Sequence, residues 1–426
     1  MKTNGEKIDK HYWKRIVVLL CLGWVTIWIY RASLTPLFSE IQGTVGFHTN
    51  AQMGLISSCY FFGATSMQIP AGMLVDRLGK KTVMIPGFIL FGLAAFMITQ
   101  AQSLTMIYFA SVLAGLGCGS YYGAAFSLSS ESIPQHRKGL STAIINSGSA
   151  VGMGIGMILS SLLVKQLDLP WQSMMFLCFG LIVTMILAFT FGIKPNSKKD
   201  TPIPTTLESE ATKQSAATSD KQPKGLFSPK MLVSYLLYFG TCYGYYMVVT
   251  WLPAFLQDER GFKGLAIGFS SALVAFAAIP GALIFSRISD KWQSKKISII
   301  LALELGAAAM LLLTVTANNS SLLLIALILY GFLGKLAVEP IIISFISDQA
   351  NPLILGTTLG ISNFFGLSAS IFAPTITGVI SDASGTREMG FYISIIIMVL
   401  AAVAFFIVNK IPEKKAAFEL EESGEA

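Results

Sequence analysis

The sequence GWVTIWIYRASLTP, residues 23–36, decides how this chain folds. It lies within an apolar run from about Ile16 to Phe38, which is long enough to cross a bilayer as a helix. Arg31 lies well inside this run, where a guanidinium is costly and does not escape by losing its proton. It must face a water-filled cavity, a partner or a ligand, unless its side chain snorkels to the outer headgroups. We favour an anion-binding role for Arg31.

The composition indicates a polytopic membrane protein. Of 426 residues, 53% are hydrophobic and 12% are charged, and the mean hydropathy is +0.65. Soluble domains average about 25% charged residues. The net charge of +7 does not indicate a nucleic-acid partner, because the basic residues are spread over loops rather than gathered on one soluble domain.

The cysteines and histidines do not form a recognisable metal site. All cysteines fall in apolar segments, and we interpret them as free thiols: Cys21, Cys59, Cys118, Cys178 and Cys242. The histidines lie outside these segments. We predict no metal and no cofactor, and the lack of a phosphate-binding loop or a nucleophile–His pair argues against an enzyme.

Twelve apolar runs predict an all-α membrane protein with twelve transmembrane helices. They lie near residues 16–38, 51–72, 82–99, 104–127, 141–164, 172–193, 231–256, 264–286, 297–316, 321–345, 356–380 and 389–409. A polar stretch separates the sixth run from the seventh and has the composition of a linker. We therefore predict a six-helix bundle over 1–193, a cytoplasmic linker over 194–230, a second bundle over 231–411 and a cytoplasmic tail over 412–426.

The distribution of basic residues predicts the orientation. Of the 30 Lys and Arg residues, only Lys165, Arg260, Lys263 and Arg387 fall in the expected external loops, and Arg31 and Lys335 fall within spans. This bias predicts cytoplasmic N- and C-termini in the cytoplasmic membrane.

An internal repeat relates the two halves. At an offset of 217 residues the matches are Pro36 with Pro253, Phe38 with Phe255, Glu131 with Asp348, Gly139 with Gly356 and Asn146 with Asn363. At an offset of 214, Asp76-Arg77 matches Asp290-Lys291. Two weakly self-similar six-helix halves are typical of secondary transporters.

The stretch GMLVDRLGKK, residues 72–81, resembles the loop signature G-x-x-x-D-R-x-G-R/K-R/K of the major facilitator superfamily. The resemblance covers nearly the whole chain and implies two pseudo-symmetric bundles with a gate at the inner side. Gly72 would permit close helix approach, and Asp76 would contact the start of span eleven. Arg77 can pair with Glu131. Alternatively, these charges only fix topology.

The second half carries a degenerate copy of this signature, SRISDK, at residues 286–291. By the repeat, Asp290 and Lys291 take the places of Asp76 and Arg77, and Lys291 can pair with Asp348. These residues complete the predicted inner gate.

Span ten carries the other charges that we expect to function. Lys335 and Glu339 are four residues apart, share a helix face and can pair. We predict that Glu339 is the proton-coupling carboxylate and Lys335 its partner, although a permanent structural pair is the alternative. Pro340 loosens the local helix. We interpret Glu304 in span nine as a packing residue with its head near the inner interface.

The stretch YRASL, residues 30–34, resembles the first-span aromatic/acidic-Arg-x-x-Leu of the anion:cation symporters. This family moves organic anions with protons or sodium. The chain departs from the family in having Tyr30 where Asp is frequent and in lacking a span-four carboxylate. Span four contains the stretch AGLGCGSYY at residues 114–122. Three positions before this stretch, Ser111 stands where proton-coupled members of the superfamily usually have Arg.

We predict a secondary transporter of a small organic anion, a carboxylate or sugar acid, coupled to a proton or sodium and acting as a monomer. The predicted substrate site comprises Arg31, Tyr30, Tyr121, Tyr122, Asn146, Tyr243, Lys335 and Asn363. Core packing or interfacial anchoring is the alternative for the tyrosines, and a bond to a neighbouring helix is the alternative for the asparagines. The second hypothesis, favoured by the aromatic span seven, is a proton-driven exporter of amphipathic compounds, and a transporter-like receptor is the third.

Overall fold

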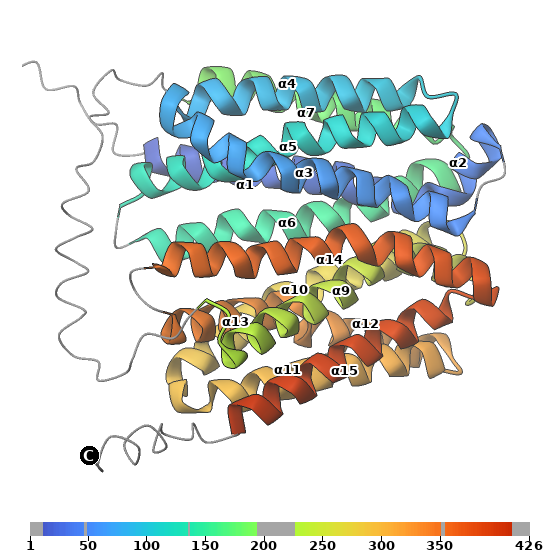
Figure 1. Ribbon diagram of the computed structural model, residues 1–426. Helices are drawn as coiled ribbons and strands as arrows, with labels where there is room; N and C mark the ends of the chain where they lie inside the picture. The colour runs from blue at the N-terminus through green and yellow to red at the C-terminus, as the bar shows by residue number, and fades with distance from the viewer. Residues whose placement is uncertain (1–11, 47–48, 135–136, 194–225, 351–353, 411–426) are drawn as a thin grey trace, which may run out of the picture.

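The computed structural model describes residues 12–46, 49–134, 137–193, 226–350 and 354–410. The predicted linker and C-terminal tail fall almost entirely outside these residues. The described chain is helical throughout, and its long helices run side by side (Figure 1). We call the end at which Tyr12 and Lys410 lie the tail end, and the opposite end, with Asn50 and Arg387, the far end.

The first half forms one bundle. Its elements are α1 (Tyr12–Ser33), η1 (Thr35–Leu37), α2 (Phe38–Val45), α3 (Asn50–Leu78), α4 (Lys80–Thr99), α5 (Leu104–Ser132), α6 (Lys138–Ser160), η3 (Ser161–Gln166) and α7 (Gln172–Gly192). Their ends follow local sequence. Thr49 and Gln52 form a capping box at the start of α3, and the hydroxyl of Ser103 accepts a hydrogen bond at the start of α5.

The second half forms the other bundle. Its elements are α9 (Pro229–Asp258), α10 (Leu265–Lys291), η4 (Gln293–Lys295), α11 (Lys296–Thr316), α12 (Ser320–Leu333), α13 (Lys335–Gln349), α14 (Leu355–Ser384) and α15 (Glu388–Lys410). Gly385 ends α14 in the left-handed conformation, with a φ of 74°.

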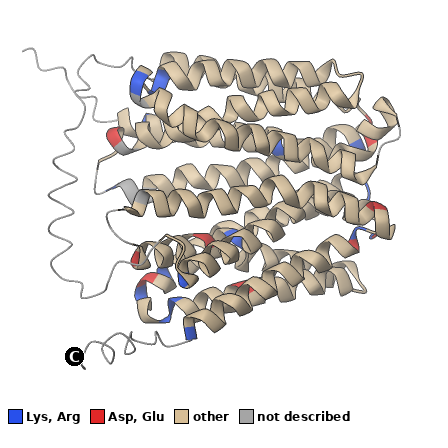
Figure 2. Cartoon of the chain, in the orientation of Figure 1, with Lys and Arg blue, Asp and Glu red and all other residues tan. Residues whose placement is uncertain are grey.

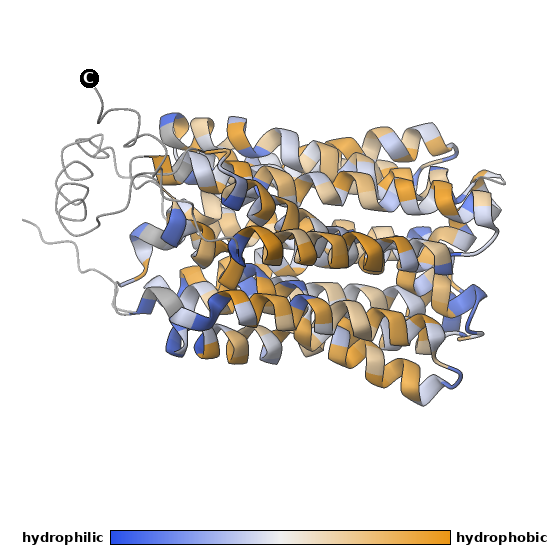
Figure 3. Cartoon of the chain, turned by 60° about the horizontal axis from the view of Figure 1, so that its bottom comes forward, coloured by the Kyte–Doolittle hydropathy of each residue, from blue (hydrophilic) through white to orange (hydrophobic). Residues whose placement is uncertain are grey.

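Within the described residues, eleven segments are long and apolar enough to cross a membrane, and one of them joins α12 to α13. The 29-residue α3 packs among them as the twelfth. Charged residues lie mainly at the two ends (Figure 2), and apolar residues occupy the length between them (Figure 3). The predicted fold of twelve transmembrane helices in two bundles is confirmed.

Glycines on α6 bring that helix close to α1, which carries Arg31. A Cβ at Gly148 would lie 2.6 Å from the carbonyl oxygen of Cys21, and one at Gly156 would lie 2.6 Å from that of Ile29. A larger residue therefore cannot occupy either position without separating the helices. This small-residue face fixes α1 within the bundle.

The two bundles meet along two helix pairs, α3 with α14 and α6 with α10. The hydroxyl of Ser58 in α3 lies 2.8 Å from that of Thr375 in α14, and Asn363 Nδ2 donates to Gln68 Oε1 over 3.2 Å. Figure 1 shows α6 and α14 at the centre of the molecule. In each of these two pairs, one helix belongs to the first half and the other helix belongs to the second half.

Two predicted spans are interrupted. The first ends as α1 at Ser33 and continues through η1 and α2. Span ten, predicted as one helix over 321–345, divides at Gly334 into α12 and α13. The break precedes Lys335 and lies six residues before Pro340, so the glycine rather than the proline interrupts this span.

Candidate functional site

Arg31 lies in the last turn of α1 against aromatic rings from three helices. Its guanidinium carbon is 3.9 Å from the ring centroid of Trp28, 3.8 Å from that of Phe61 in α3 and 5.0 Å from that of Tyr246 in α9. Aromatic faces attract a cation, and most strongly where water is excluded. The rings hold the guanidinium without neutralising its charge.

One edge of the Arg31 guanidinium has no hydrogen-bond partner among the described residues. Its Nε and Nη2 atoms are both buried and both unpaired. These two N–H groups point the same way, at the spacing of the two oxygens of a carboxylate. Because buried donors are almost always satisfied, this edge fits an anionic ligand.

The second charged group is formed by Lys335 and Glu339 at the start of α13. Lys335 Nζ lies 2.7 Å from Glu339 Oε2, so the predicted pair is present. The other oxygen, Oε1, accepts a hydrogen bond from the hydroxyl of Tyr238 in α9. Both carboxylate oxygens thus have donors, which is the arrangement that an ionised Glu339 requires.

Tyr246 connects the two charged groups. Its ring centroid lies 5.0 Å from the Arg31 guanidinium and 6.0 Å from Lys335 Nζ, and the ring of Tyr245 lies 5.4 Å from that Nζ. Arg31 and Lys335 therefore face the same aromatic side chain from opposite bundles. A ligand between the bundles meets a cation on each side, separated by a ring.

Three other predicted binding residues differ in accessibility. Tyr30 is buried, and its ring packs on Phe91 at a centroid distance of 4.9 Å. Tyr122 is 42% exposed and lies within electrostatic range of Lys335 and Glu339. Asn146 is exposed on α6, two turns from Met153, whose sulfur accepts a hydrogen bond from the hydroxyl of Tyr245. Tyr122 and Asn146 thus face the interface between the bundles.

The remaining predicted binding residues are engaged in packing. Tyr121 is fully buried, and its hydroxyl donates to the carbonyl of Leu20 over 2.5 Å, so its assignment to the substrate site is corrected to a core role. Tyr243 packs against Phe239 in the same helix. Asn363 bonds to α3 as described above, which is the alternative left open by the sequence.

The predicted gate pairs are also corrected. Glu131 pairs with Lys80 rather than Arg77, and Asp348 pairs with Lys296 rather than Lys291, at 2.5 Å for the second pair. Both lysines are the first residues of their helices and point into the bundle, where they are only 7% exposed. Each pair joins helices of one half, so neither pair links the two bundles.

Among the gate residues whose side chains the structure describes, Arg77 and Lys291 do not make the predicted contacts. Arg77, Asp290 and Lys291 are exposed. A Cβ at Gly72 would meet nothing within 4 Å, whereas one at Gly123 of α5 would lie 3.6 Å from the Cα of Gly72. Helix α5 therefore passes next to Gly72, but on the side away from the direction that a Cβ at Gly72 would take. The side chain of Asp76 lies outside the described residues, and its gating role stays a prediction.

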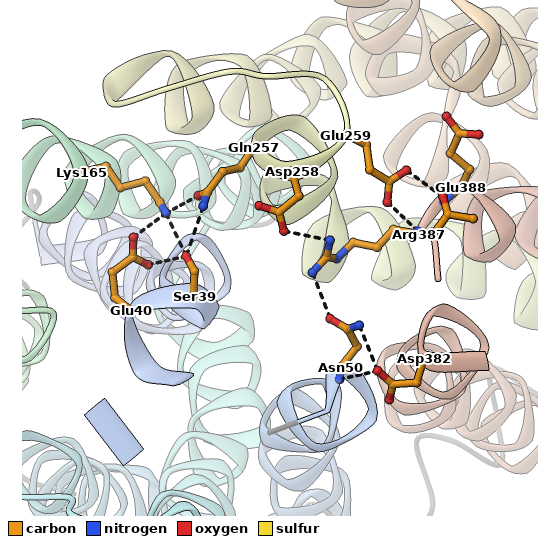
Figure 4. Close-up of polar contacts among 11 residues, drawn as sticks. Ser39, Glu40, Asn50, Lys165, Gln257, Asp258, Glu259, Asp382, Arg387 and Glu388 are labelled. Atoms are coloured by element: carbon orange, nitrogen blue, oxygen red, sulfur yellow. Dashed lines mark hydrogen bonds and ion pairs between the residues drawn. The ribbon is translucent and has the colours of Figure 1, made fainter. Parts of the chain in front are cut away.

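Contacts between the bundles are concentrated at the far end (Figure 4). Lys165 of η3 contacts Gln257 of α9, and Arg387 Nη2 donates to Asn50 Oδ1 over 2.9 Å. Asp382 of α14 accepts hydrogen bonds from the backbone N–H groups of Asn50 and Ala51, both at 2.8 Å. The far end is therefore closed by polar contacts, which the sequence analysis did not predict.

Sequence reasoning missed two kinds of residue. Trp28 is three positions before Arg31, and this spacing places both residues on one helix face. The sequence therefore contained enough information to predict their contact. Phe61 is far away in sequence, so only tertiary structure brings it to Arg31.

Glu304 was interpreted as a packing residue with its head near the inner interface. It is instead fully buried, and its carboxyl group lies against Thr241 of α9.

The fold and the two facing charged groups define a multi-pass membrane transporter. The sequence matches the family model of the Major Facilitator Superfamily over residues 16–374, and the chain belongs to this family. The resemblance to its organic-anion transporters is also confirmed by the relatives.

The relatives span nearly the whole chain. A probable sulfoacetate transporter of Cupriavidus necator is 23% identical and aligns over 94% of this chain and 96% of its own length. A cis,cis-muconate transport protein of Acinetobacter baylyi is 23% identical and aligns over 97% of each chain. A D-galactonate transporter of Escherichia coli is also 23% identical, over 93% and 95%.

Solved structures share the fold. The nucleoside transporter NupG superposes with a TM-score of 0.72 at 15% identity, over 93% of this chain and 100% of that structure. A bacterial homologue of the lysosomal transporter Spinster gives a TM-score of 0.69 at 15% identity, over 95% and 97%.

Proposed function

We propose that the protein moves a small organic anion, a carboxylate or sugar acid, across the cytoplasmic membrane by alternating access, coupled to protons as a symporter. The observation that carries this proposal is the buried, unpaired Nε–Nη2 edge of Arg31. A substrate carboxylate supplies the two acceptors that this edge lacks. The names of the relatives, which are transporters of organic acids, support the same substrate class.

Lys335 and Glu339 provide the coupling in this proposal. An anion that enters between the bundles competes with Glu339 for Lys335, which is already paired. Protonation of Glu339 removes this competition and frees Lys335 to hold the anion together with Arg31. Loss of the proton restores the pair and favours release of the substrate.

The closed far end gives the proposal a direction. With both termini cytoplasmic, as the basic residues predict, the far end is external and the contacts of Asp382 and Arg387 seal that side. The described state is then ready to exchange substrate with the cytoplasm. In this proposal, Tyr122 and Asn146 border the path between Arg31 and the cytoplasm.

Thermal-shift measurements on the purified protein test the substrate class. The panel is sulfoacetate, cis,cis-muconate, D-galactonate and tartrate, with matched neutral amides and lipophilic cations as controls. We expect an acid to raise the melting temperature of the wild type and to have no effect on Arg31→Ala. Stabilisation by lipophilic cations alone, or an equal shift in Arg31→Ala, would contradict the proposal.

A further inference from the structure

Glu304 is a buried acid outside the site described above. It lies in α11, is 0% exposed, and faces α9. Its surroundings differ from those of Glu339, which has two hydrogen-bond donors. The hydrogen-bond donors around Glu304 indicate which protonation state its site favours.

Thr241 is the partner of Glu304, and its hydroxyl has only one proton. Thr241 Oγ1 lies 2.9 Å from the carbonyl oxygen of Leu237 and 2.8 Å from Glu304 Oε2. Thr241 therefore gives Glu304 at most one hydrogen bond, which its hydroxyl shares with the carbonyl of Leu237. Among the described residues this is the one donor to the carboxyl group of Glu304, a poor environment for a buried negative charge.

The other oxygen of Glu304 leads to the same conclusion. Oε1 is buried and has no hydrogen-bond partner among the described residues. A carboxylate left in this way in a membrane interior is strongly disfavoured, whereas a neutral acid tolerates one free carbonyl oxygen. Both atoms of the carboxyl group therefore fit the protonated form.

The neighbouring helices offer Glu304 no free cation among the described residues. The titratable groups that face it are Cys242 of α9 and Tyr330 of α12. Lys335 of α13 lies within electrostatic range of Cys242, but it is already paired with Glu339. From α15, residues 393–409 contribute no titratable side chain.

We propose that Glu304 is a second proton-binding site of the transporter, loaded while Glu339 is ionised, and that it gives up its proton during the transport cycle. Thr241 and Tyr238 are three residues apart on α9, so the partner of Glu304 and the partner of Glu339 share one helix face. Two carboxyl groups held in opposite protonation states by their surroundings form an acid–base pair. The inference rests on the proposed proton coupling and assigns a second residue to it.

The proton balance of this step is simple. When an anion takes Lys335, Glu339 loses its cation and becomes the group that needs a proton. Glu304 releases one proton from its carboxyl group, either to Glu339 or to water that enters between the bundles, and takes up another proton later in the cycle. No redox or covalent change is involved, so the step needs only the proton that symport already supplies.

Infrared spectroscopy of the full-length protein in liposomes tests the site without a substrate. We expect a carboxylic-acid C=O band at neutral pH that is lost in Glu304→Gln and kept in Glu339→Gln. The band should shift in D₂O, because an exchangeable proton is replaced, and should move in Thr241→Val. A band unchanged in Glu304→Gln, or one that resists deuteration, would overturn the proposal.

A transport measurement tests the role in the cycle. The amide of Glu304→Gln can still donate to Thr241, so this variant should fold and keep substrate exchange. We expect it to lose proton-driven accumulation of whichever panel acid the wild type accumulates. Normal accumulation would overturn the role in coupling. If the wild type accumulates none of the acids, the proposed function fails, while the infrared result still decides whether Glu304 binds an exchangeable proton.

Discussion

At the scale of single residues, the planar shape of Arg31 matters as much as its charge. Arg31→Lys keeps the charge but loses both the stacked plane and the two-pronged edge. A hydrogen bond to a charged group contributes about 1.5–3 kcal/mol, so we predict a rise in the apparent substrate KM of roughly 10- to 100-fold. Uptake kinetics in proteoliposomes measure the change, and normal kinetics in a well-folded Arg31→Ala protein would contradict it.

Glu339 gives a second prediction, which separates coupling from structure. Glu339→Gln removes the negative charge but keeps a group that can accept from Tyr238. We predict that pH-driven accumulation is lost while substrate exchange across the membrane continues. A structural pair would instead leave Lys335 buried and unpaired, and stability and both activities would fall together. Accumulation that still follows the pH gradient in the variant would exclude the coupling role.

The neighbouring residues Tyr121 and Tyr122 form a matched pair for a third prediction. Tyr121→Phe removes a buried hydroxyl that bonds to Leu20, so it should cost about 0.5–1.5 kcal/mol of stability and leave transport kinetics unchanged. Tyr122 is partly exposed toward Lys335, so Tyr122→Phe should alter KM and leave the melting temperature unchanged. The opposite pattern would reverse the two roles.

At the scale of elements, the break between α12 and α13 positions Lys335. A Cβ at Gly334 would lie 2.6 Å from the carbonyl oxygen of Tyr330. We therefore predict that Gly334→Ala displaces the start of α13 and lowers transport, with loss of the Lys335–Glu339 pair. The control is Gly180→Ala in α7, where a methyl group meets nothing within 4 Å and should change neither stability nor transport. Equal behaviour of the two variants would show that the break tolerates a side chain.

The sequence predicted the elements well because each depends on a local pattern. Apolar length located the spans, and the spacing of Lys335 and Glu339 was sufficient to predict their pair. The break at Gly334 was not predictable, because glycine is frequent inside membrane helices. The partner of Glu131 was missed for a different reason. Arg77 and Lys80 are only three residues apart in the sequence, but Arg77 lies in the last turn of α3, whereas Lys80 begins α4 and points into the bundle.

Residues that meet across the bundles were the least predictable part of the site. Phe61, Arg31 and Tyr246 come from three helices, and no spacing in the sequence relates them. Likewise, the hydrogen bond between Glu304 and Thr241 depends on how α11 packs on α9. The sequence could indicate which charges lie in the membrane, but not which neighbours decide their protonation.

At the scale of the whole molecule, closure of the far end depends on a carboxylate of one bundle that caps the first turn of a helix in the other bundle. Asp382 of α14 accepts from two backbone N–H groups in the first turn of α3, a site where the helix dipole favours negative charge (Figure 4). Arg387 adds a bond to Asn50 and pairs with Asp258 at 2.8 Å. The pair with Asp258 lies within the second bundle, whereas the contacts of Asp382 and Arg387 with α3 form only when the bundles meet at this end. The contacts with α3 therefore stabilise the closed state and not the open one.

Neutralising Asp382 should therefore shift the conformational equilibrium. A negative charge at a helix N-terminus contributes about 0.3–1 kcal/mol, and up to about 2 kcal/mol where it is partly buried. Asp382→Asn should therefore raise the population that is open at the far end by roughly 2- to 30-fold. The measurement is the labelling rate of Ser57→Cys, in a background without native cysteines, by a membrane-impermeant maleimide added at the far end. Ser57 lies in α3 beside the small cavity next to Arg31.

The matched control is Asp168→Asn, which removes the same charge from the same end of the molecule at a residue with left-handed backbone, where Asn is tolerated. Asp168 lines a surface cavity at this end together with Lys165 and Gln257, and it does not lie at the start of α3. Labelling should therefore rise for Asp382→Asn and stay at the parental rate for Asp168→Asn. If both variants label at the parental rate, the contact with α3 does not hold the far end closed. If both rise together, the general loss of negative charge, rather than the capping of α3, controls the closure.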